Sequence, residues 1–236
     1  MAILSKSEAR TLYDGNAGRY DAMLILYRLA GLTHHRKMLV QSLQLQPGAV
    51  VVDLCCGTGA NLSYLSRAVG PAGKVLAVDW SAGMLERARQ KIAAESLQNV
   101  ELICGDVEEY QFPGRLQAVV STFGLEMVPA YGAVVQRIAA ALPEGGRLGL
   151  LGLQYPENWP GWCVDLGMRL NRPFGVSREY RDFKPWQEAE LQFDIEVFRN
   201  LLFGAAYFCL ATRKTATRGR FNSRGTSHET TRLTAP

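Results

Sequence analysis

The chain has 236 residues, of which 47% are hydrophobic and 20% are charged, and its formal net charge is +4. These values are typical of a globular protein with a sizeable core, and they exclude a disordered or fibrous chain. Six basic residues and a single acid lie in 213–236, and the remaining chain holds 20 basic and 21 acidic residues. Because this body is nearly neutral, it has no field that would steer nucleic acid, and a nucleic-acid partner is not expected.

Cysteine usage and hydropathy limit the cellular compartments in which the protein is expected. The five cysteines are an odd number without a Cys-x-x-Cys pair, so the sequence predicts neither a disulfide framework nor a metal site. The first residues lack the apolar stretch of a signal peptide, and no apolar run is long enough to span a bilayer. We therefore expect a cytoplasmic protein without a transmembrane segment. Contact with a membrane surface and the oligomeric state stay open.

The order of apolar patterns predicts the fold class. Residues 1–46 show helical periodicity and predict an N-terminal helical cap. From Ala49 onward, short apolar runs alternate with helical segments, a pattern typical of a parallel sheet built from βαβ units. The expected strands are 49–54, 74–79, 100–104, 117–122, 147–153, 191–198 and 205–212, and the expected helices are 60–69, 82–95 and 131–142.

The alternation breaks at 154–190, which holds three of the four tryptophans and is interpreted as an insertion that shapes an acceptor site. The last two strands are close enough to form an antiparallel hairpin, which gives the sheet a mixed edge. The sequence thus predicts one α/β domain over 1–212: a Rossmann-like, seven-stranded mixed sheet with helices on both faces. The basic tail, 213–236, is expected to be disordered.

A glycine turn follows the first strand, in the run Cys55-Cys56-Gly57-Thr58-Gly59. Gly57 and Gly59 have no Cβ, so a ligand can approach the backbone there, at the strand end where doubly wound sheets bind ligands. Asp79 ends the second strand 20 residues after Gly59, the separation at which a carboxylate reaches a ribose hydroxyl pair. The pattern predicts an adenosine ligand, and the alternative is a tight turn alone.

Two residues argue against a dinucleotide at this turn. Leu62 stands where the third glycine of Gly-x-Gly-x-x-Gly would be, and that glycine normally allows the helix to pack near a pyrophosphate. Asp53, just before the turn, would repel a pyrophosphate, whereas it favours a sulfonium ligand that carries an ammonium group. A nicotinamide enzyme is therefore the weaker interpretation.

In these features the chain resembles the class I S-adenosylmethionine-dependent methyltransferases, and more specifically the ubiquinone/menaquinone C-methyltransferase group. The resemblance covers 11–153 and resumes faintly over 191–212. It implies S-adenosylmethionine as cofactor, with methyl transfer to a small molecule that is aromatic or amphiphilic. The cofactor-binding residues that follow from the glycine turn and the resemblance are Tyr13, Tyr20, Asp53, Cys55, Gly57, Thr58, Gly59, Asp79, Trp80, Met84, Asp106, Val107, Thr122 and Phe123.

The resemblance also assigns roles. Aromatic residues of the segment that contains Tyr13 and Tyr20 would close over the methionine end, unless the segment is an ordinary amphipathic helix. Asp79 would bind the ribose, with Trp80 beside the adenine. Asp106 would bind the adenine amino group, unless it is merely solvated. The loop 121–125 would pass under the cofactor and face the acceptor.

The acceptor side is less defined. The expected substrate-binding residues are Phe123, Trp162, Arg172, Phe174, Arg178 and Tyr180, because aromatic walls with a few polar anchors are typical of small-ligand pockets. Aromatic residues of 154–190 can equally form local core, and its arginines a solvated face. A general base is needed only if the acceptor arrives protonated, and His34, His35 and Tyr20 are its candidates, with a surface role as the alternative for the histidines.

Three other functions remain open at this point. The same fold can transfer the aminocarboxypropyl group of the cofactor, which would release methylthioadenosine. Nucleic-acid methylation is supported only by the basic tail, and the Asn/Asp-Pro-Pro-Tyr/Phe motif is absent at 121–124. A non-enzymatic module would bind the cofactor without turnover.

Overall fold

The computed structural model describes residues 31–171 and 181–215. Most of the predicted helical cap and the end of the basic tail lie outside these ranges. So do six predicted site residues: Tyr13, Tyr20, Arg172, Phe174, Arg178 and Tyr180.

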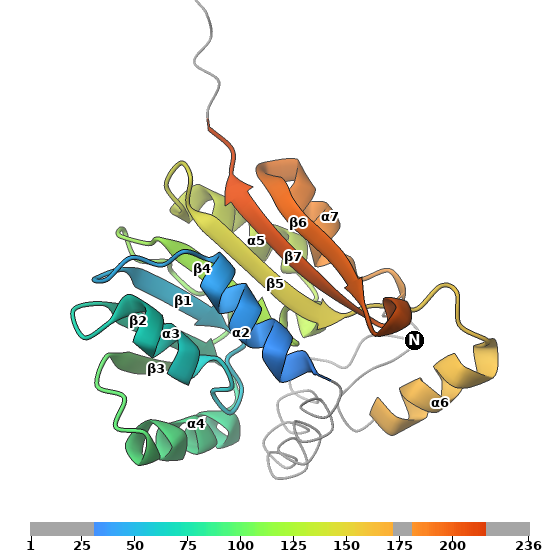
Figure 1. Ribbon diagram of the computed structural model, residues 1–236, viewed down its shortest axis with the longest axis horizontal. Helices are drawn as coiled ribbons and strands as arrows, with labels where there is room; N and C mark the ends of the chain where they lie inside the picture. Colours follow the sequence, from blue (N-terminus) through green and yellow to red (C-terminus); the bar gives the residue numbers. More distant parts are fainter. Residues whose placement is uncertain (1–30, 172–180, 216–236) are drawn as a thin grey trace, which may run out of the picture.

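One seven-stranded sheet forms the centre of the molecule, in the order β3-β2-β1-β4-β5-β7-β6 (Figure 1). Strands β1 to β5 are parallel, and β7 runs antiparallel to both β5 and β6, as the apolar runs and the short last connection predict. The strand bounds are β1 Val50–Leu54, β2 Lys74–Asp79, β3 Val100–Cys104, β4 Ala118–Thr122, β5 Arg147–Leu153, β6 Phe193–Leu201 and β7 Ala206–Arg213.

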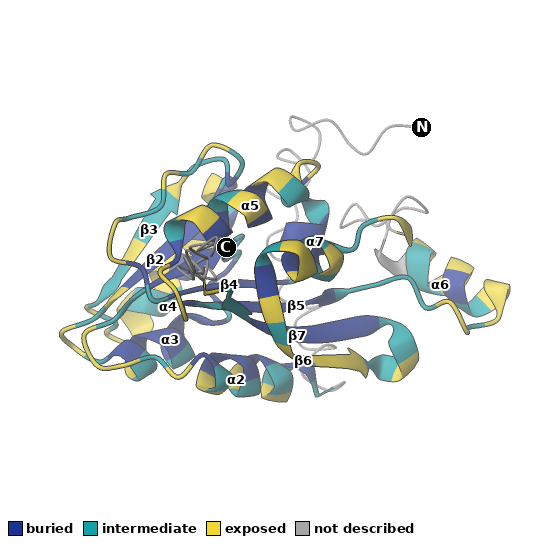
Figure 2. Cartoon of the chain, turned by 90° about the horizontal axis from the view of Figure 1, so that it is seen from above, coloured by how far each residue is buried: buried dark blue, intermediate teal, exposed yellow. Residues whose placement is uncertain are grey.

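Helices cover both faces of the sheet, with buried strands between them (Figure 2). Residues of α2 Leu32–Ser42, α3 Leu62–Val69 and α4 Ala82–Ala94 share one core cluster with the sheet. On the opposite face, α5 Tyr131–Ala141 and α7 Pro185–Gln192 contribute to the second cluster. This arrangement confirms the predicted mixed α/β fold and leaves the carboxyl ends of the parallel strands at one edge.

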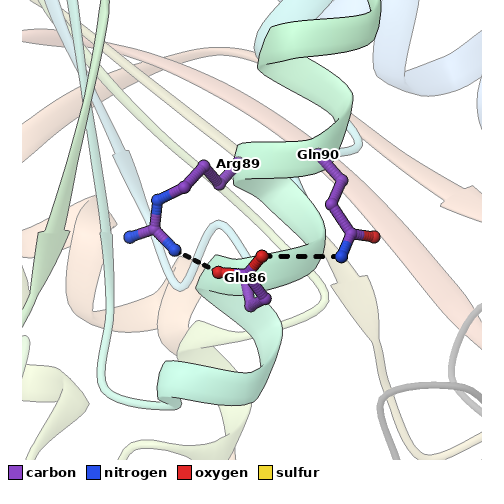
Figure 3. Close-up of polar contacts among 3 residues, drawn as sticks. All are labelled: Glu86, Arg89 and Gln90. Carbon is purple, nitrogen blue, oxygen red and sulfur yellow. Dashed lines mark hydrogen bonds and ion pairs between the residues drawn. The ribbon is translucent and has the colours of Figure 1, made fainter.

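Helix α4 shows how the local sequence specifies its ends and faces. Its apolar face buries Met84, Leu85 and Ala88 against the sheet. On the exposed face Glu86 accepts from Arg89, and it also makes a long contact of 3.5 Å with Gln90 Nε2 (Figure 3). Pairs at these spacings stabilise a helix by only about 0.2 to 0.5 kcal/mol each, so burial of the apolar face is the larger contribution.

Ser81 caps the N-terminus of α4, because its Oγ accepts from Met84 N at 3.2 Å. Replacing Ser81 with alanine is expected to lower the free energy of unfolding by about 1 kcal/mol, measured by urea denaturation. Ser121→Ala is the matched control: the Ser121 hydroxyl is buried and has no hydrogen-bond partner in the described chain, so its loss should leave stability nearly unchanged. Equal losses in the two variants would contradict the capping role.

The region 154–190 contains two helices that the sequence pattern did not predict. Helix α6, Gly161–Asn171, lies beyond the turn between β6 and β7 (Figure 1), and Trp159 Nε1 donates to Phe203 O at 2.9 Å across that turn. Helix α7 begins with Pro185, which suits a first helical turn, and it packs on α5 and β6. Trp186 on α7 lies 4.5 Å from the Tyr207 ring, centroid to centroid, and thus belongs to the core.

The terminal hairpin is shifted toward the C-terminus relative to the prediction. Helix α7 continues to Gln192, so β6 begins at Phe193 rather than 191, and it extends to Leu201. The 3-10 helix η4, Leu202–Gly204, makes the turn. At the other end Arg213 pairs with Phe193 in the ladder, so this residue of the predicted tail belongs to β7. Within the described chain, no helix is both long and apolar enough to cross a membrane.

Candidate cofactor and acceptor site

The glycine turn after β1 is fixed by hydrogen bonds to β2 and to Asp79. Cys55, Gly57 and Gly59 all have positive φ angles, of 55°, 55° and 82°. Cys56 N donates to Val78 O at 3.1 Å. Gly57 N donates to Asp79 Oδ2 at 2.9 Å, and Ser81 N donates to Asp79 Oδ1 at the same distance. The carboxylate predicted to bind a ribose therefore has a fixed orientation beside the turn.

A pocket that is partly open to solvent lies at the carboxyl ends of β1, β2 and β4. Eight of the predicted cofactor-binding residues line it: Cys55, Gly57, Asp79, Trp80, Met84, Asp106, Val107 and Phe123. Within the described residues no cluster of His, Cys, Asp and Glu could hold a metal ion.

Gly124, in the loop 121–125 that was predicted to pass under the cofactor, also lines the pocket. Four further lining residues were missed by the sequence reasoning: Glu108, Met127, Val128 and Pro129. The last three belong to the 3-10 helix η1, Leu125–Met127, and the residues that follow it. Before η1 the backbone turns through Phe123, whose φ is 58°. A Cβ at Gly124 would collide with the Cβ of Cys55. Because glycine has no Cβ, this loop packs directly on the glycine turn. The apolar run 127–129 was the signal that could have extended the predicted site.

Four other predicted residues, Asp53, Thr58, Gly59 and Thr122, are not among the lining residues. Asp53 is fully buried, and its Oδ1 accepts from Asn61 Nδ2 at 2.9 Å. Asn61 Nδ2 also donates to Thr122 Oγ1 at 3.0 Å. Arg36 of α2, only 5% exposed, donates to Thr122 and Asn61. The sequence reasoning missed Arg36 and Asn61, because Arg36 stands in a basic run that looks like a solvated helix face.

This buried network, Arg36–Asn61–Asp53–Thr122, carries both signs of charge and two atoms without partners. Within the described chain, neither Arg36 Nη2 nor Asp53 Oδ2 makes a hydrogen bond. Burial raises the pKa of Asp53 to about 7, although the Asn61 hydrogen bond and the Arg36 charge oppose that rise. The Arg36 guanidinium also lies over the Phe123 ring, 4.8 Å from its centroid, which connects the network to the pocket wall.

A second buried carboxyl lies behind the η1 wall of the pocket. Glu126 is 2% exposed, and its Oε1 accepts from the Tyr207 hydroxyl. Glu126 Oε2 has no hydrogen-bond partner in the described chain. Burial raises the pKa of Glu126 to about 7, and the Tyr207 hydrogen bond limits the rise. Sequence reasoning had no signal for this residue, since a lone glutamate after a strand is normally exposed.

The raised pKa of Glu126 predicts a pH-dependent stability. The folded state binds this proton more tightly than the unfolded state, whose pKa is near 4.5, so stability is full below about pH 4.5 and falls as pH rises to about 7. At roughly 1.4 kcal/mol per pH unit, the loss is about 3 kcal/mol. Glu126→Gln removes this titration. The free energy of unfolding of the variant minus that of the unaltered protein should therefore rise by about 3 kcal/mol between pH 5 and pH 8, measured by urea unfolding.

The exposed Glu109→Gln is the matched control and should show the same difference from the unaltered protein at both pH values. A Glu126→Gln variant whose relative stability does not change between pH 5 and pH 8 would show that Glu126 ionises normally.

The remaining predicted residues lie elsewhere. His34 is exposed and His35 half-buried on α2, and neither lines the pocket. Burial and the neighbouring charges of His34 and Arg199 lower the pKa of His35. Trp162 is 71% exposed on α6 and does not line the pocket either. The structure therefore brings eight of the predicted cofactor residues together around one pocket but does not bring these three side chains to it.

Known methyltransferases resemble this chain in sequence. A family model described as a methyltransferase domain matches residues 51–146. A demethylmenaquinone methyltransferase of Listeria monocytogenes serotype 4a is 30% identical over 199 residues, which are 82% of this chain and 84% of the relative. One from Geobacillus stearothermophilus is 33% identical over 144 residues, 60% of this chain and 62% of the relative.

Two solved structures share the fold. An S-adenosylmethionine-dependent methyltransferase from Aquifex aeolicus has a TM-score of 0.57 at 18% identity, covering 76% of this chain and 89% of its own. Geranyl diphosphate C-methyltransferase from Streptomyces coelicolor, solved with S-adenosyl-L-homocysteine, has a TM-score of 0.60 at 16% identity, with coverages of 76% and 78%.

Proposed function

The chain belongs to the class I S-adenosylmethionine-dependent methyltransferases, and we propose that its acceptor is a small aromatic molecule of amphiphilic character. The observation that carries the proposal is the pocket at the ends of β1, β2 and β4, where Asp79 is held by two backbone N–H groups. The relatives that are 30% identical are named for demethylmenaquinone, a quinone, which supports an acceptor of this class.

The described residues fit the cofactor. We assign Asp79 to the ribose hydroxyls and Trp80, Met84 and Val107 to the apolar walls around the adenine, because all four line the pocket. Behind the glycine turn, Asp53 Oδ2 and Arg36 Nη2 have no hydrogen-bond partner among the described residues, and the two side chains suit the ammonium and carboxylate of a methionine. We assign the methionine end to these two residues, with closure by the segment around Tyr13 and Tyr20.

When bound, S-adenosylmethionine supplies an electrophilic methyl group on a sulfonium sulfur. The protein then has to align the acceptor with that methyl group and exclude water, and such alignment can contribute about 7 to 11 kcal/mol. The loop from Phe123 to Pro129 forms the wall between the cofactor residues and the end of β5. We place the acceptor against this loop and assign the remaining walls to 154–190, including Trp162, Arg172, Phe174, Arg178 and Tyr180.

The test uses S-adenosylmethionine labelled in its methyl group, with reduced demethylmenaquinone carrying a short prenyl chain as the first acceptor. Phenols, an aminated lipid and double-stranded DNA form the comparison panel. We expect a labelled methylated quinol and S-adenosylhomocysteine in equal amounts. Label in the DNA alone, or release of methylthioadenosine, would refute the proposal. Cofactor binding without product from any small molecule would also refute it.

A further inference from the structure

Glu126 differs from the other carboxyls around the pocket in its hydrogen bonding. Asp79 accepts two backbone N–H groups, Asp106 accepts Glu108 N at 2.9 Å, and Glu108 accepts Ala130 N at 3.0 Å. These three carboxylates therefore hold the loops of the site. Glu126 accepts one side-chain hydroxyl, and its second oxygen is buried without a partner in the described chain. An isolated buried oxygen of this kind is costly and calls for a functional explanation.

The fold places this carboxyl at the same sheet edge as the cofactor pocket. Gly152, the second-last residue of β5, pairs directly with Tyr207 of β7, and the Glu126 carboxyl occupies the space that a side chain at Gly152 would fill. On its own element, Glu126 is flanked by Leu125 and by Met127, which lines the pocket. The carboxyl thus lies at the carboxyl end of β5, directly behind the η1 wall against which the proposed function puts the acceptor.

We propose that Glu126, held by Tyr207, accepts the proton that the methyl acceptor gives up. The inference rests on the proposed function, because it requires a protonated acceptor such as a quinol. During transfer the bond from the acceptor to the methyl carbon forms. The bond from sulfur to that carbon breaks, and its electron pair stays on the sulfur. The acceptor's proton passes to Glu126 Oε2, so the products are the methylated acceptor, S-adenosylhomocysteine and a protonated Glu126, which then loses its proton to solvent.

The surroundings of Glu126 suit a base that works near neutral pH. Its pKa of about 7 allows it to take a proton and to release it again, and the best general bases have pKa values near the working pH. Among the described elements, the titratable groups that face it are Tyr207 on β7 and Cys55 at the end of β1, while β5 presents Gly152. Burial and nearby carboxylates keep the pKa of Cys55 well above its usual range, so this thiol stays neutral.

The first measurement is the pH profile of kcat/KM for methylation of reduced demethylmenaquinone by full-length protein. In the unaltered protein the profile should rise to a plateau with an apparent pKa near 7. Glu126→Gln should lower kcat at least 100-fold and leave the dissociation constant of S-adenosylmethionine unchanged. Tyr207→Phe removes the hydrogen bond that lowers the pKa of Glu126. The acid limb of this variant's pH profile should therefore move to higher pH. Glu109→Gln should behave like the unaltered protein.

The second measurement does not need turnover. An infrared carbonyl band that is lost in Glu126→Gln identifies the protonated carboxyl at pH 6, and adding S-adenosylhomocysteine with 1-naphthol should shift that band. If the unaltered protein makes no product from any small molecule of the panel, the proposed function is wrong, and this band decides on Glu126 alone. An unshifted band would overturn the inference. So would a folded Glu126→Gln variant with kcat within threefold of the unaltered protein, or an unmoved acid limb in Tyr207→Phe.

Discussion

Asp79→Asn is expected to weaken binding of S-adenosylmethionine about 100-fold, measured by isothermal titration calorimetry. The substitution removes a negative charge that accepts hydrogen bonds from Gly57 N and Ser81 N. It also puts an amide NH₂ opposite one of these donors, so the glycine turn can no longer keep its geometry. Hydrogen bonds to a charged group contribute about 1.5 to 3 kcal/mol each, and a loss of about 2.7 kcal/mol corresponds to the 100-fold change.

Asp194→Asn is the matched control, because Asp194 is an exposed aspartate on β6, remote from the pocket lining. It should leave the dissociation constant unchanged. Thermal unfolding of both variants without ligand separates lost binding from lost folding. An Asp79→Asn protein that is folded and binds S-adenosylmethionine within threefold of the unaltered protein would remove Asp79 from the site.

The cofactor half of the site could be predicted from sequence because its determinants are local. Gly57, Gly59 and Asp79 lie at strand ends, and the carboxyl ends of parallel strands meet at one edge of the sheet. Once the alternation of apolar runs and helices fixed the strands, these residues had to converge. The same reasoning could not tell which of the predicted residues line the pocket and which are buried next to it. The structure buries Asp53 and Thr122, which are bonded to Asn61 and do not line the pocket.

The buried charges could not be predicted, because their burial depends on contacts between distant elements. Arg36 is buried only because α2 crosses the sheet face that carries Thr122, 86 positions later in the chain. Glu126 depends on Gly152 and on Tyr207, 81 positions away. Neither residue belongs to a motif at short spacing. The role of the aromatic residues of 154–190 stayed open for a related reason: the sequence allowed either a pocket wall or local core, and the structure packs Trp186 on Tyr207 of the core.

Backbone strain marks the same place as these buried groups. Cys55 and Phe123 are non-glycine residues with φ of 55° and 58°, and each follows the last residue of a strand, β1 and β4, that pair with each other. A residue with a side chain disfavours this conformation, and such residues cluster at functional sites. The two strained turns pack together where Gly124 contacts Cys55. The conformation of these two turns at the pocket is therefore fixed by the surrounding sheet rather than by the backbone preferences of Cys55 and Phe123.

Gly152→Ala is expected to lower the free energy of unfolding by about 4 kcal/mol, measured by urea denaturation at pH 5, where the buried Glu126 carboxyl is neutral. The backbone of Gly152 is extended, so alanine meets no conformational barrier there. Its Cβ, however, would collide with Glu126 Oε1, and β5 cannot move because it is paired on both sides. The carboxyl must leave, which adds the loss of its buried hydrogen bond to Tyr207, about 1 to 3 kcal/mol, to an overpacking cost of similar size.

The double variant Gly152→Ala/Glu126→Ala tests this cause directly. Shortening Glu126 removes the atoms that the new methyl group meets, so the double variant should be at least 2 kcal/mol more stable than the sum of the two single losses predicts. Gly114→Ala is the matched control, since a Cβ at Gly114 meets no atom within 4 Å, and it should change stability by less than about 1 kcal/mol. If the losses at Gly152 and Glu126 simply add, the carboxyl does not occupy the space over β5, and Glu126 loses the geometric basis for its role in proton transfer.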